Sequence, residues 1–414
     1  MNQTGENAVT TRNLLRSTAL GAAMALGLAI PAFAQIPNNT LKVGVLSDMS
    51  GPFSQQAGAG SVVAAQMAAE KFREEAGDLK VEILSADHQN KVDVGSSLAR
   101  SWLDRDGVTA IVDLPNSGVA LAISNLLNEK NRVTLASTAA SSDMTGKDCK
   151  TTTVQWDWDT WALGNAIARA VTAAGGKSWY FISFDYALGK ALERDTSEAL
   201  ATLGGKVLGG VKHPLGTMDF SSYILQAQSS GAEVIALGDT GADAVDAIKQ
   251  MSEFGVFKGK TKLAALFLLL TDVQAIGPEL AQGTLLAEPF YWDLNDKTRD
   301  FAKRFAARMN GQMPTTDHAG VYSSVLAYLR AAKAANTVEG DKVVAEMRKH
   351  TIDDDLFGPT DIRVDGRAVH NMYVFQVKTP SESKNKYDLY KLVQTIPPEQ
   401  AFRPLNAGGC PLVK

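Results

Sequence analysis

Short apolar runs alternate along most of the chain with longer runs in which apolar residues recur at helical spacing. The apolar runs predict strands at residues 41–46, 80–85, 110–113, 133–136, 178–184, 206–212, 233–237 and 263–270. The runs with helical spacing predict helices at residues 61–75, 93–104, 117–130, 188–203, 221–230 and 242–254. Strands that alternate with helices belong to β-α-β units and parallel sheets. The run 263–270 is apolar throughout, as is typical of a parallel strand buried on both faces.

The alternation restarts after residues 156–162, and this restart predicts two doubly wound α/β lobes of similar build. The C-terminal third differs, with predicted helices at 298–309, 321–335 and 342–349 and strand-like pieces at 360–363, 371–378 and 388–395. These pieces fit as additions to the two lobes, so the chain would cross between lobes more than once and form a multi-strand hinge. The predicted boundaries are residues 40–157 plus 289–367 for lobe 1, 158–288 plus 368–396 for lobe 2, and 397–414 for a C-terminal tail.

The first 34 residues have the pattern of a secretory signal peptide. Arg12 and Arg16 precede an apolar run over residues 19–30, and the segment closes on the small-residue pattern of residues 32–34. The apolar run is too short to span a bilayer. Cleavage after Ala34 predicts an exported, soluble, periplasmic protein.

The net charge of the chain bears on its possible partners, and its two cysteines bear on a possible disulfide. The 414-residue chain has 41 Lys and Arg against 45 Asp and Glu, a net charge of −4, which predicts no nucleic-acid partner and no polybasic membrane patch. The two cysteines, Cys149 and Cys410, form an even pair in an oxidising compartment, and a disulfide between them is expected. The alternative is two buried free thiols.

Signatures of enzymes are weak. The Gly58-Ala-Gly60 pattern is similar to part of a dinucleotide loop, but Val63 stands where the third glycine is needed, so a plain turn is expected. The five histidines are scattered without the spacing of metal ligands. The chain is therefore expected to be no enzyme and to hold no metal or cofactor. An exported hydrolase using Ser117 or Ser141 stays open as an alternative, as does a ligand-sensing subunit.

Two turns have the composition of an anion site. Residues 113–121 follow the third predicted strand, and residues 136–145 follow the fourth. Each turn places small hydroxyl residues and backbone N–H groups at the start of a helix, at the carboxyl end of a parallel strand, where α/β sheets bind ligands. Ordinary N-capping by Ser117 and Ser141 would explain the same residues.

The chain as a whole resembles the periplasmic solute-binding proteins of the branched-chain amino acid (Leu/Ile/Val) ABC importer family. The resemblance rests on residues 42–54, 116–121, 137–145, 320–325 and 372–376, which occur in matching order. It implies a two-lobed, hinge-closing protein of the type I periplasmic binding class, without a cofactor and monomeric. Such a protein binds a small carboxylate ligand and delivers it to a membrane permease.

The resemblance also assigns ligand contacts. A hydroxyl donor falls at Ser117, with Asn116 beside it, and the donors of the second turn fall at Thr138, Ala140 and Ser141. A cleft tyrosine is matched by Tyr186, whereas Gln56 stands near the position of a tryptophan that lines the pocket in relatives.

Two further positions depart from the family pattern and bear on the ligand. Leu270 lies where an acid should hold the ammonium group, with Asp272 just beyond it, and Asp239-Thr240 replaces an aromatic contact. If Leu270 faces the cleft and neither aspartate does, an ammonium group would be unpaired, so an aromatic or short-chain organic acid is expected. If either aspartate points inward, an amino acid or amide is expected.

The tryptophans near the crossing between the lobes favour the organic acid. Trp158 or Trp161 could stack on a planar ligand. Packing of the hinge is the alternative role for these rings.

Overall fold

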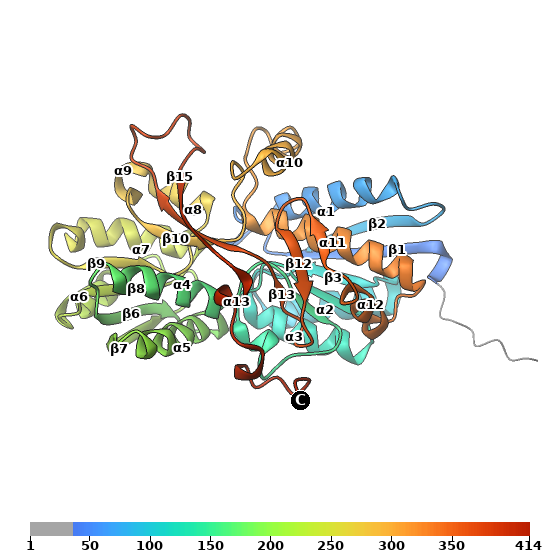
Figure 1. Cartoon of the computed structure of the whole chain (residues 1–414), viewed down its shortest axis with the longest axis horizontal. Coiled ribbons are helices and arrows are strands. Elements are labelled where there is room, and N and C mark those ends of the chain that lie inside the picture. The colour runs from blue at the N-terminus through green and yellow to red at the C-terminus, as the bar shows by residue number, and fades with distance from the viewer. Residues whose placement is uncertain (1–35) are drawn as a thin grey trace, which may run out of the picture. The chain divides into compact units, whose positions relative to one another are not determined.

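A computed structural model describes residues 36–414 and contains two parallel sheets (Figure 1). The predicted signal peptide lies outside the described residues. The first sheet has the strand order β2-β1-β3-β4-β5, formed by Lys80–Asp87, Thr40–Ser47, Ala110–Asp113, Val133–Ala136 and Thr153–Gln155. The second sheet has the order β7-β6-β8-β9, formed by Lys206–His213, Ser178–Phe184, Val234–Gly238 and Lys262–Ala265. All pairings in both sheets are parallel, which confirms the predicted α/β class.

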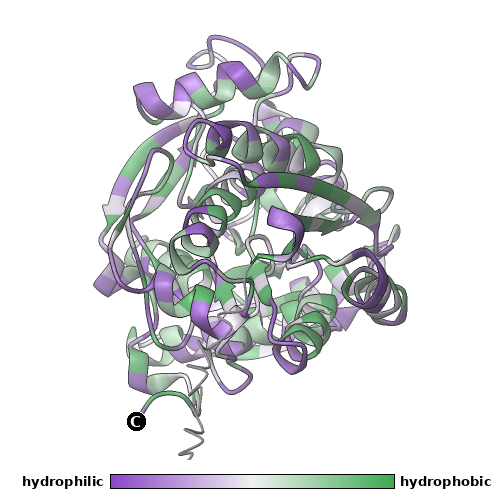
Figure 2. Ribbon diagram, turned by 90° about the vertical axis from the view of Figure 1, so that its right-hand side faces the viewer, coloured by the Kyte–Doolittle hydropathy of each residue, from purple (hydrophilic) through white to green (hydrophobic). Residues whose placement is uncertain are grey.

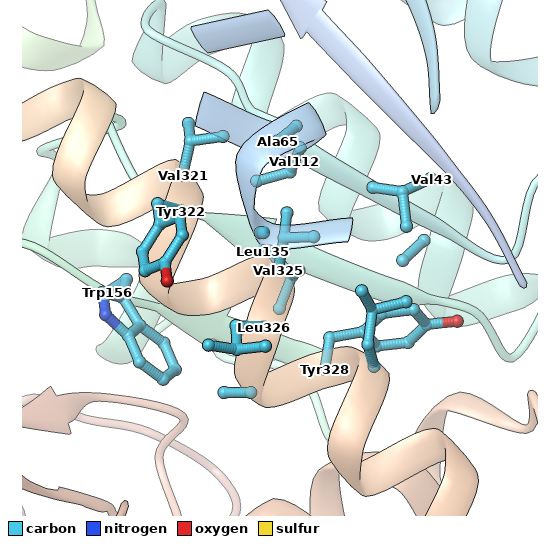
Figure 3. Packing of buried hydrophobic residues seen from close by; sticks show 14 of the residues in the cluster. Val43, Ala65, Val112, Leu135, Trp156, Val321, Tyr322, Val325, Leu326 and Tyr328 are labelled. Atoms are coloured by element: carbon cyan, nitrogen blue, oxygen red, sulfur yellow. The ribbon is translucent and has the colours of Figure 1, made fainter. Parts of the chain in front are cut away.

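Helices cover both faces of the first sheet because its central strands are apolar on both sides. Val112 of β3 points into a cluster with α1 (Gly58–Arg73) and α11 (Thr316–Ala335), as Figure 3 shows around Val325. The preceding residue, Ile111, points to the other face and packs with α2 (Val92–Ser101) and α3 (Ser117–Glu129). This alternation is the side-chain period of a strand buried on both faces.

The second sheet is covered in the same way. Phe181 of β6 packs with α4 (Thr160–Ala173) and α5 (Ala187–Thr202) on one face. Its neighbour Ile182 packs on the other face, with α6 (Ser221–Ser229) and α7 (Gly241–Glu253). In Figure 2 green segments are frequent in the interior of the molecule, and purple segments are frequent along its outer helices and loops. Among the described residues, no helix is long and apolar enough to span a bilayer.

The C-terminal third adds to both cores, as its sequence pattern predicts. Helix α11 packs along α1 in the first core, joined there by residues of α10 (Asp296–Ala306) and α12 (Gly340–Met347). A three-stranded antiparallel sheet consists of β10 (Leu285–Glu288), β14 (Met372–Val377) and β15 (Tyr390–Ile396). Its residues Val374 and Phe375 reach the two clusters of the second sheet. A small sheet consists of β11 (Ile352–Asp354), β12 (Gly358–Ile362) and β13 (Ala368–Val369). The exact lobe boundaries given above stay a proposal.

The predicted strand over 263–270 is wrong in its second half. Strand β9 ends at Ala265, and the helix α8 (Leu270–Ile276) begins where the strand was expected to end. The run is apolar because all of its residues from Ala264 onward are buried, and uniform burial hides the change from strand to helix. The carboxylate of Asp272, 3.0 Å from the N–H of Leu269, accepts a hydrogen bond that fixes the first turn of α8.

The cysteines form a disulfide that ties the tail to the segment after the second predicted turn. Cys149 and Cys410 are bonded, with their Cα atoms 5.6 Å apart, so the free-thiol alternative is wrong. Arg403 of the tail donates to the carbonyl of Ser142 (2.9 Å). A Cβ on Gly146 would lie 2.7 Å from the carbonyl oxygen of Gly408, so glycine is needed for this close approach.

Candidate functional site

The candidate site begins at the carboxyl edge of the first sheet, where the parallel strands β1, β3 and β4 all end. Ser47 is the last residue of β1 and Asp113 the last of β3, and Thr138 follows β4. The N–H of Thr138 donates to the carbonyl of Asp113 (3.3 Å), which holds the ends of the two neighbouring strands together. The carboxyl edge of a parallel sheet is where such folds bind ligands.

The two turns predicted to bind an anion meet at this edge. The N–H of Ser141 donates to the hydroxyl oxygen of Ser117 at 3.2 Å, and both residues are fully buried. The hydroxyl proton of Ser117 is thus left to donate to another group. Asn116 is the N-cap of α3, and its side-chain oxygen accepts hydrogen bonds from the N–H groups of Gly118 and Val119. Ser141 caps the short 3-10 turn that follows it.

The second turn offers further donors. Within residues 36–414, the backbone N–H groups of Ala139 and Ala140 make no hydrogen bond, and neither does the hydroxyl of Thr138. All three residues are buried. The carbonyl of Ala140 accepts from the N–H of Thr160, which fastens the turn to the start of α4. Together with Ser117, these groups can bind a carboxylate at the start of α3.

Three other predicted residues form one buried contact. The side-chain amide of Gln56 lies 2.7 Å from the hydroxyl of Thr240 and 2.7 Å from the carboxylate of Asp272. Burial raises the pKa of Asp272 to about 6, although hydrogen bonds oppose the shift. Leu270 lies in the same helix and lines a cavity of about 190 Å³ together with Gln55. The contact brings together the loop after β1 and elements of the second sheet.

Asp239 and Tyr186 lie at the carboxyl edge of the second sheet. Asp239 is bonded through both oxygens to Nε2 of His213 at 3.0 Å, with both side chains fully buried. Burial alone would lower the pKa of His213, but the hydrogen bond and charge of Asp239 outweigh it and raise the pKa. The hydroxyl of Tyr186 is buried without a partner in the described part of the chain, and burial raises its pKa well above the usual value.

Trp158 is an interior residue. It is fully buried, and its ring meets Phe267 edge-on with the centroids 4.9 Å apart. Its carbonyl accepts from Arg367, which also bonds the carbonyl of Trp156. These contacts fit the packing role that was the alternative to stacking on a ligand, whereas Trp161 is only partly buried and lines a surface groove.

The sequence pattern does not identify three buried carboxylates near the first sheet, Asp113, Asp157 and Asp317, which we call the acid cluster. Burial raises the pKa of Asp113 to about 7 and raises the pKa of Asp157 and of Asp317 well above the usual range. Asp113 has a backbone φ of 84°, a left-handed conformation that is uncommon outside glycine. Strain of this kind concentrates at functional sites, but it leaves no signal in the sequence.

Comparison with known proteins identifies the family. Residues 40–385 match the family described as periplasmic binding protein. The chain belongs to this family. Its members bind substrates, and neither the family nor the fold is one of enzymes.

Two solved structures share most of the chain. A periplasmic binding protein from Burkholderia mallei is 42% identical, with 91% of this chain and 100% of that chain covered and a TM-score of 0.88. A branched chain amino acid ABC transporter periplasmic ligand-binding protein from Burkholderia xenovorans LB400 is 39% identical, with 90% and 100% covered and a TM-score of 0.80.

The curated relatives are more distant. Leu/Ile/Val-binding protein homolog 6 of Brucella melitensis is 28% identical over 252 residues, which are 60% of this chain and 63% of that protein. The alignment therefore spans less than two thirds of that relative's length.

Proposed function

We propose that this protein is the solute-binding component of an ABC importer, exported to the periplasm as a monomer. It captures a small carboxylate between two lobes and delivers it to a membrane permease. The relatives named above as ABC transporter ligand-binding and Leu/Ile/Val-binding proteins support this assignment.

The observation that carries the proposal is the buried group of donors at the first sheet. The hydroxyls of Ser117 and Thr138 and the N–H groups of Ala139 and Ala140 lie on two turns that are hydrogen-bonded to each other, and their protons have no partner in the described residues. Buried donors without partners cost free energy, and a carboxylate would remove that cost. The N–H of Ser141 donates to the hydroxyl of Ser117, and no histidine of residues 36–414 is hydrogen-bonded to either side chain, so no observation favours the hydrolase alternative.

Contacts between elements of the two sheets indicate how capture would work. The loop after β1 meets the second sheet through Gln56 and through Phe53, whose ring packs edge-on against Phe184 at 6.4 Å. The N–H of Ala242 donates to the carbonyl of Pro52 (3.3 Å). Contacts that exist only in the closed state provide the differential binding by which a ligand drives closure.

The test is a thermal-shift and calorimetric screen of residues 35–414 against amino acids, their keto and hydroxy analogues, and aromatic acids. A one-site ligand raises the melting temperature by an amount that grows with its concentration relative to Kd. The proposal expects at least one carboxylate to bind, and expects its methyl ester or amide to bind more weakly. Equal binding of an acid and its ester would contradict the carboxylate site.

A further inference from the structure

Gln155 is the last residue of β5, and its fully buried side chain contacts the second turn. The side-chain Nε2 group donates to the carbonyl of Ala139 at 2.8 Å and to the carbonyl of Ser141 at 3.1 Å. An amide NH2 group has two protons, so these two bonds use its whole donor capacity. One side chain therefore holds two carbonyl groups of the turn at once.

The orientation of the Gln155 side chain is itself fixed. Its Oε1 atom accepts from the hydroxyl of Thr145, which is also buried, at 3.3 Å. The backbone N–H of Gln155 donates to the carbonyl of Gly366 at 3.0 Å, in the segment before β13. The NH2 group has to face the carbonyls of the turn, because a carbonyl accepts a hydrogen bond and cannot donate one.

A hydrogen bond that holds a carbonyl also fixes the N–H group of the same peptide unit. The unit is planar and trans, so its C=O and N–H groups point in opposite directions. The bond from Gln155 to the carbonyl of Ala139 therefore turns the N–H of Ala140 away from Gln155. That N–H group is in a buried residue and has no partner among residues 36–414. Gln155 thus sets the direction of a free donor without touching it.

Thr160, the first residue of α4, holds the next peptide units of the turn. Its N–H donates to the carbonyl of Ala140 (2.7 Å), and its hydroxyl oxygen accepts from the N–H of Ser142 (3.1 Å). The hydroxyl proton of Thr160 goes to Asp195 of α5 (2.5 Å), which also accepts from the hydroxyl of Ser142 (2.6 Å). Within the described part of the chain, the N–H groups of residues 141 and 142 are thus bonded, and that of Ala140 is left for another acceptor.

We propose that Gln155 is a positioning residue of the carboxylate site and that its two hydrogen bonds aim the N–H of Ala140 at the bound carboxylate. This inference rests on the proposed function, in which the second turn binds the carboxylate of the solute. A donor that is oriented before binding needs no reorganisation when the anion arrives, and such preorganisation increases affinity. Gln155 acts on the carboxylate only through the turn.

Gln250 of α7 provides a matched control. Its side chain also bridges two backbone groups, since it donates to the carbonyl of Met218 (2.9 Å) and accepts from the N–H of Phe220 (2.8 Å). These bonds join α7 to the segment before α6, and none of the three residues belongs to either turn. Replacing either glutamine by methionine removes hydrogen bonds to the backbone and lowers stability. Only the replacement of Gln155 should also change the recognition of a carboxylate.

The test compares probes that differ only in the carboxylate. Calorimetry on residues 35–414 measures Kd for L-leucine against L-leucinamide and for 4-hydroxybenzoate against 4-hydroxybenzamide. For a pair whose acid binds the unaltered protein, we expect Gln155→Met to reduce the preference for the acid at least fivefold. Gln250→Met should leave that preference unchanged, although urea unfolds both variants more easily. An unchanged preference in Gln155→Met, or an equal reduction in Gln250→Met, would overturn the positioning role.

A measurement without a ligand separates this role from the proposed function. In a crystal structure of Gln155→Met we expect the peptide unit between Ala139 and Ala140 to be rotated, and an unchanged orientation would overturn the inference. Failure of both acids to bind the unaltered protein would count against the proposed function and not against the role of Gln155. If Gln155→Met does not fold, Gln155→Asn takes its place, because the shorter amide cannot reach both carbonyls. The same rotation and a smaller loss of preference are expected in Gln155→Asn.

Discussion

The side-chain amide of Gln56 lies 2.7 Å from the carboxylate of Asp272, so that the loop after β1 is bonded to the first turn of α8. The amide also reaches Thr240 at the start of α7. A single neutral donor thus joins three segments, one from the first sheet and two from the second, through buried side chains. Buried hydrogen bonds to a charged group contribute more than those at a surface.

Replacing this donor by an acid should separate the two lobes. In Gln56→Glu a second carboxylate faces Asp272, and like charges buried together repel. We expect a larger radius of gyration by small-angle X-ray scattering and at least tenfold weaker ligand binding. Gln226→Glu is the control, because Gln226 is exposed on α6 and bonds the carbonyl of Ser222 in its own helix. Lowering the pH should partly restore the compact state of Gln56→Glu, and a radius unaffected by the substitution would contradict the role given to Gln56.

Removing the hydroxyl of Ser117 should weaken ligand binding. The hydroxyl can donate to a charged carboxylate, and such a bond contributes about 1.5–3 kcal/mol, or roughly 10- to 100-fold in Kd. Calorimetry with any ligand found in the screen measures the loss for Ser117→Ala. Ser222→Ala, an exposed serine on α6, should bind as the unaltered protein does. An unchanged Kd in Ser117→Ala would place the carboxylate elsewhere.

The free energy of unfolding of the ligand-free protein should depend on pH through the acid cluster. Burial raises the pKa of Asp113 to about 7, from about 3.9 in an unfolded chain. The folded state then holds a proton that the unfolded state releases, so stability falls as pH rises from about 4 to about 7 and stays lower above that range. Urea unfolding at pH 5 and pH 8 measures the change. Asp113→Asn should show a smaller loss of stability between these pH values, and an identical loss would contradict the shift.

Loss of the disulfide should reduce both stability and ligand affinity. The bond closes a long loop between Cys149 and Cys410, and removal of such a bond typically costs about 2–5 kcal/mol. The tail it anchors also bonds the carbonyl of Ser142, next to the second turn. We expect a reductant to lower the melting temperature and raise Kd in the unaltered protein. A double variant, Cys149→Ser with Cys410→Ser, should have a similarly lowered melting temperature and raised Kd. Adding a reductant should change neither value in this variant.

The sequence predicts the strands well where turn-forming residues bound an apolar run. Residues 110–113 and 133–136 are strands β3 and β4 with the predicted ends, because each short run is followed at once by a turn. The run 263–270 lacks such a boundary, since burial between elements keeps it apolar after the strand has ended. Periodicity cannot mark an element boundary in a run without polar residues.

The candidate site was predictable only in its local parts. The meeting of Ser117 and Ser141 follows from two turns at neighbouring strand ends, which the sequence pattern contains. The acid cluster joins residues from β3, from the segment after β5 and from α11, and no local spacing relates them. The sequence-based preference for an organic acid considered Asp239 and Asp272 as the acids that could meet an ammonium group. In the structure Asp239 bonds His213 and Asp272 bonds Gln56, while the unpartnered acids lie elsewhere.

If the protein is exported as proposed, the disulfide also bears on the order in which the site is assembled. Cys410 follows every residue of the candidate site along the chain. A chain exported N-terminus first therefore brings both turns and the acid cluster outside before the partner of Cys149 arrives. During that interval the second turn is held by α4 through Thr160 but not yet by the tail through Arg403. Oxidation would then be the step that joins the tail to the second turn.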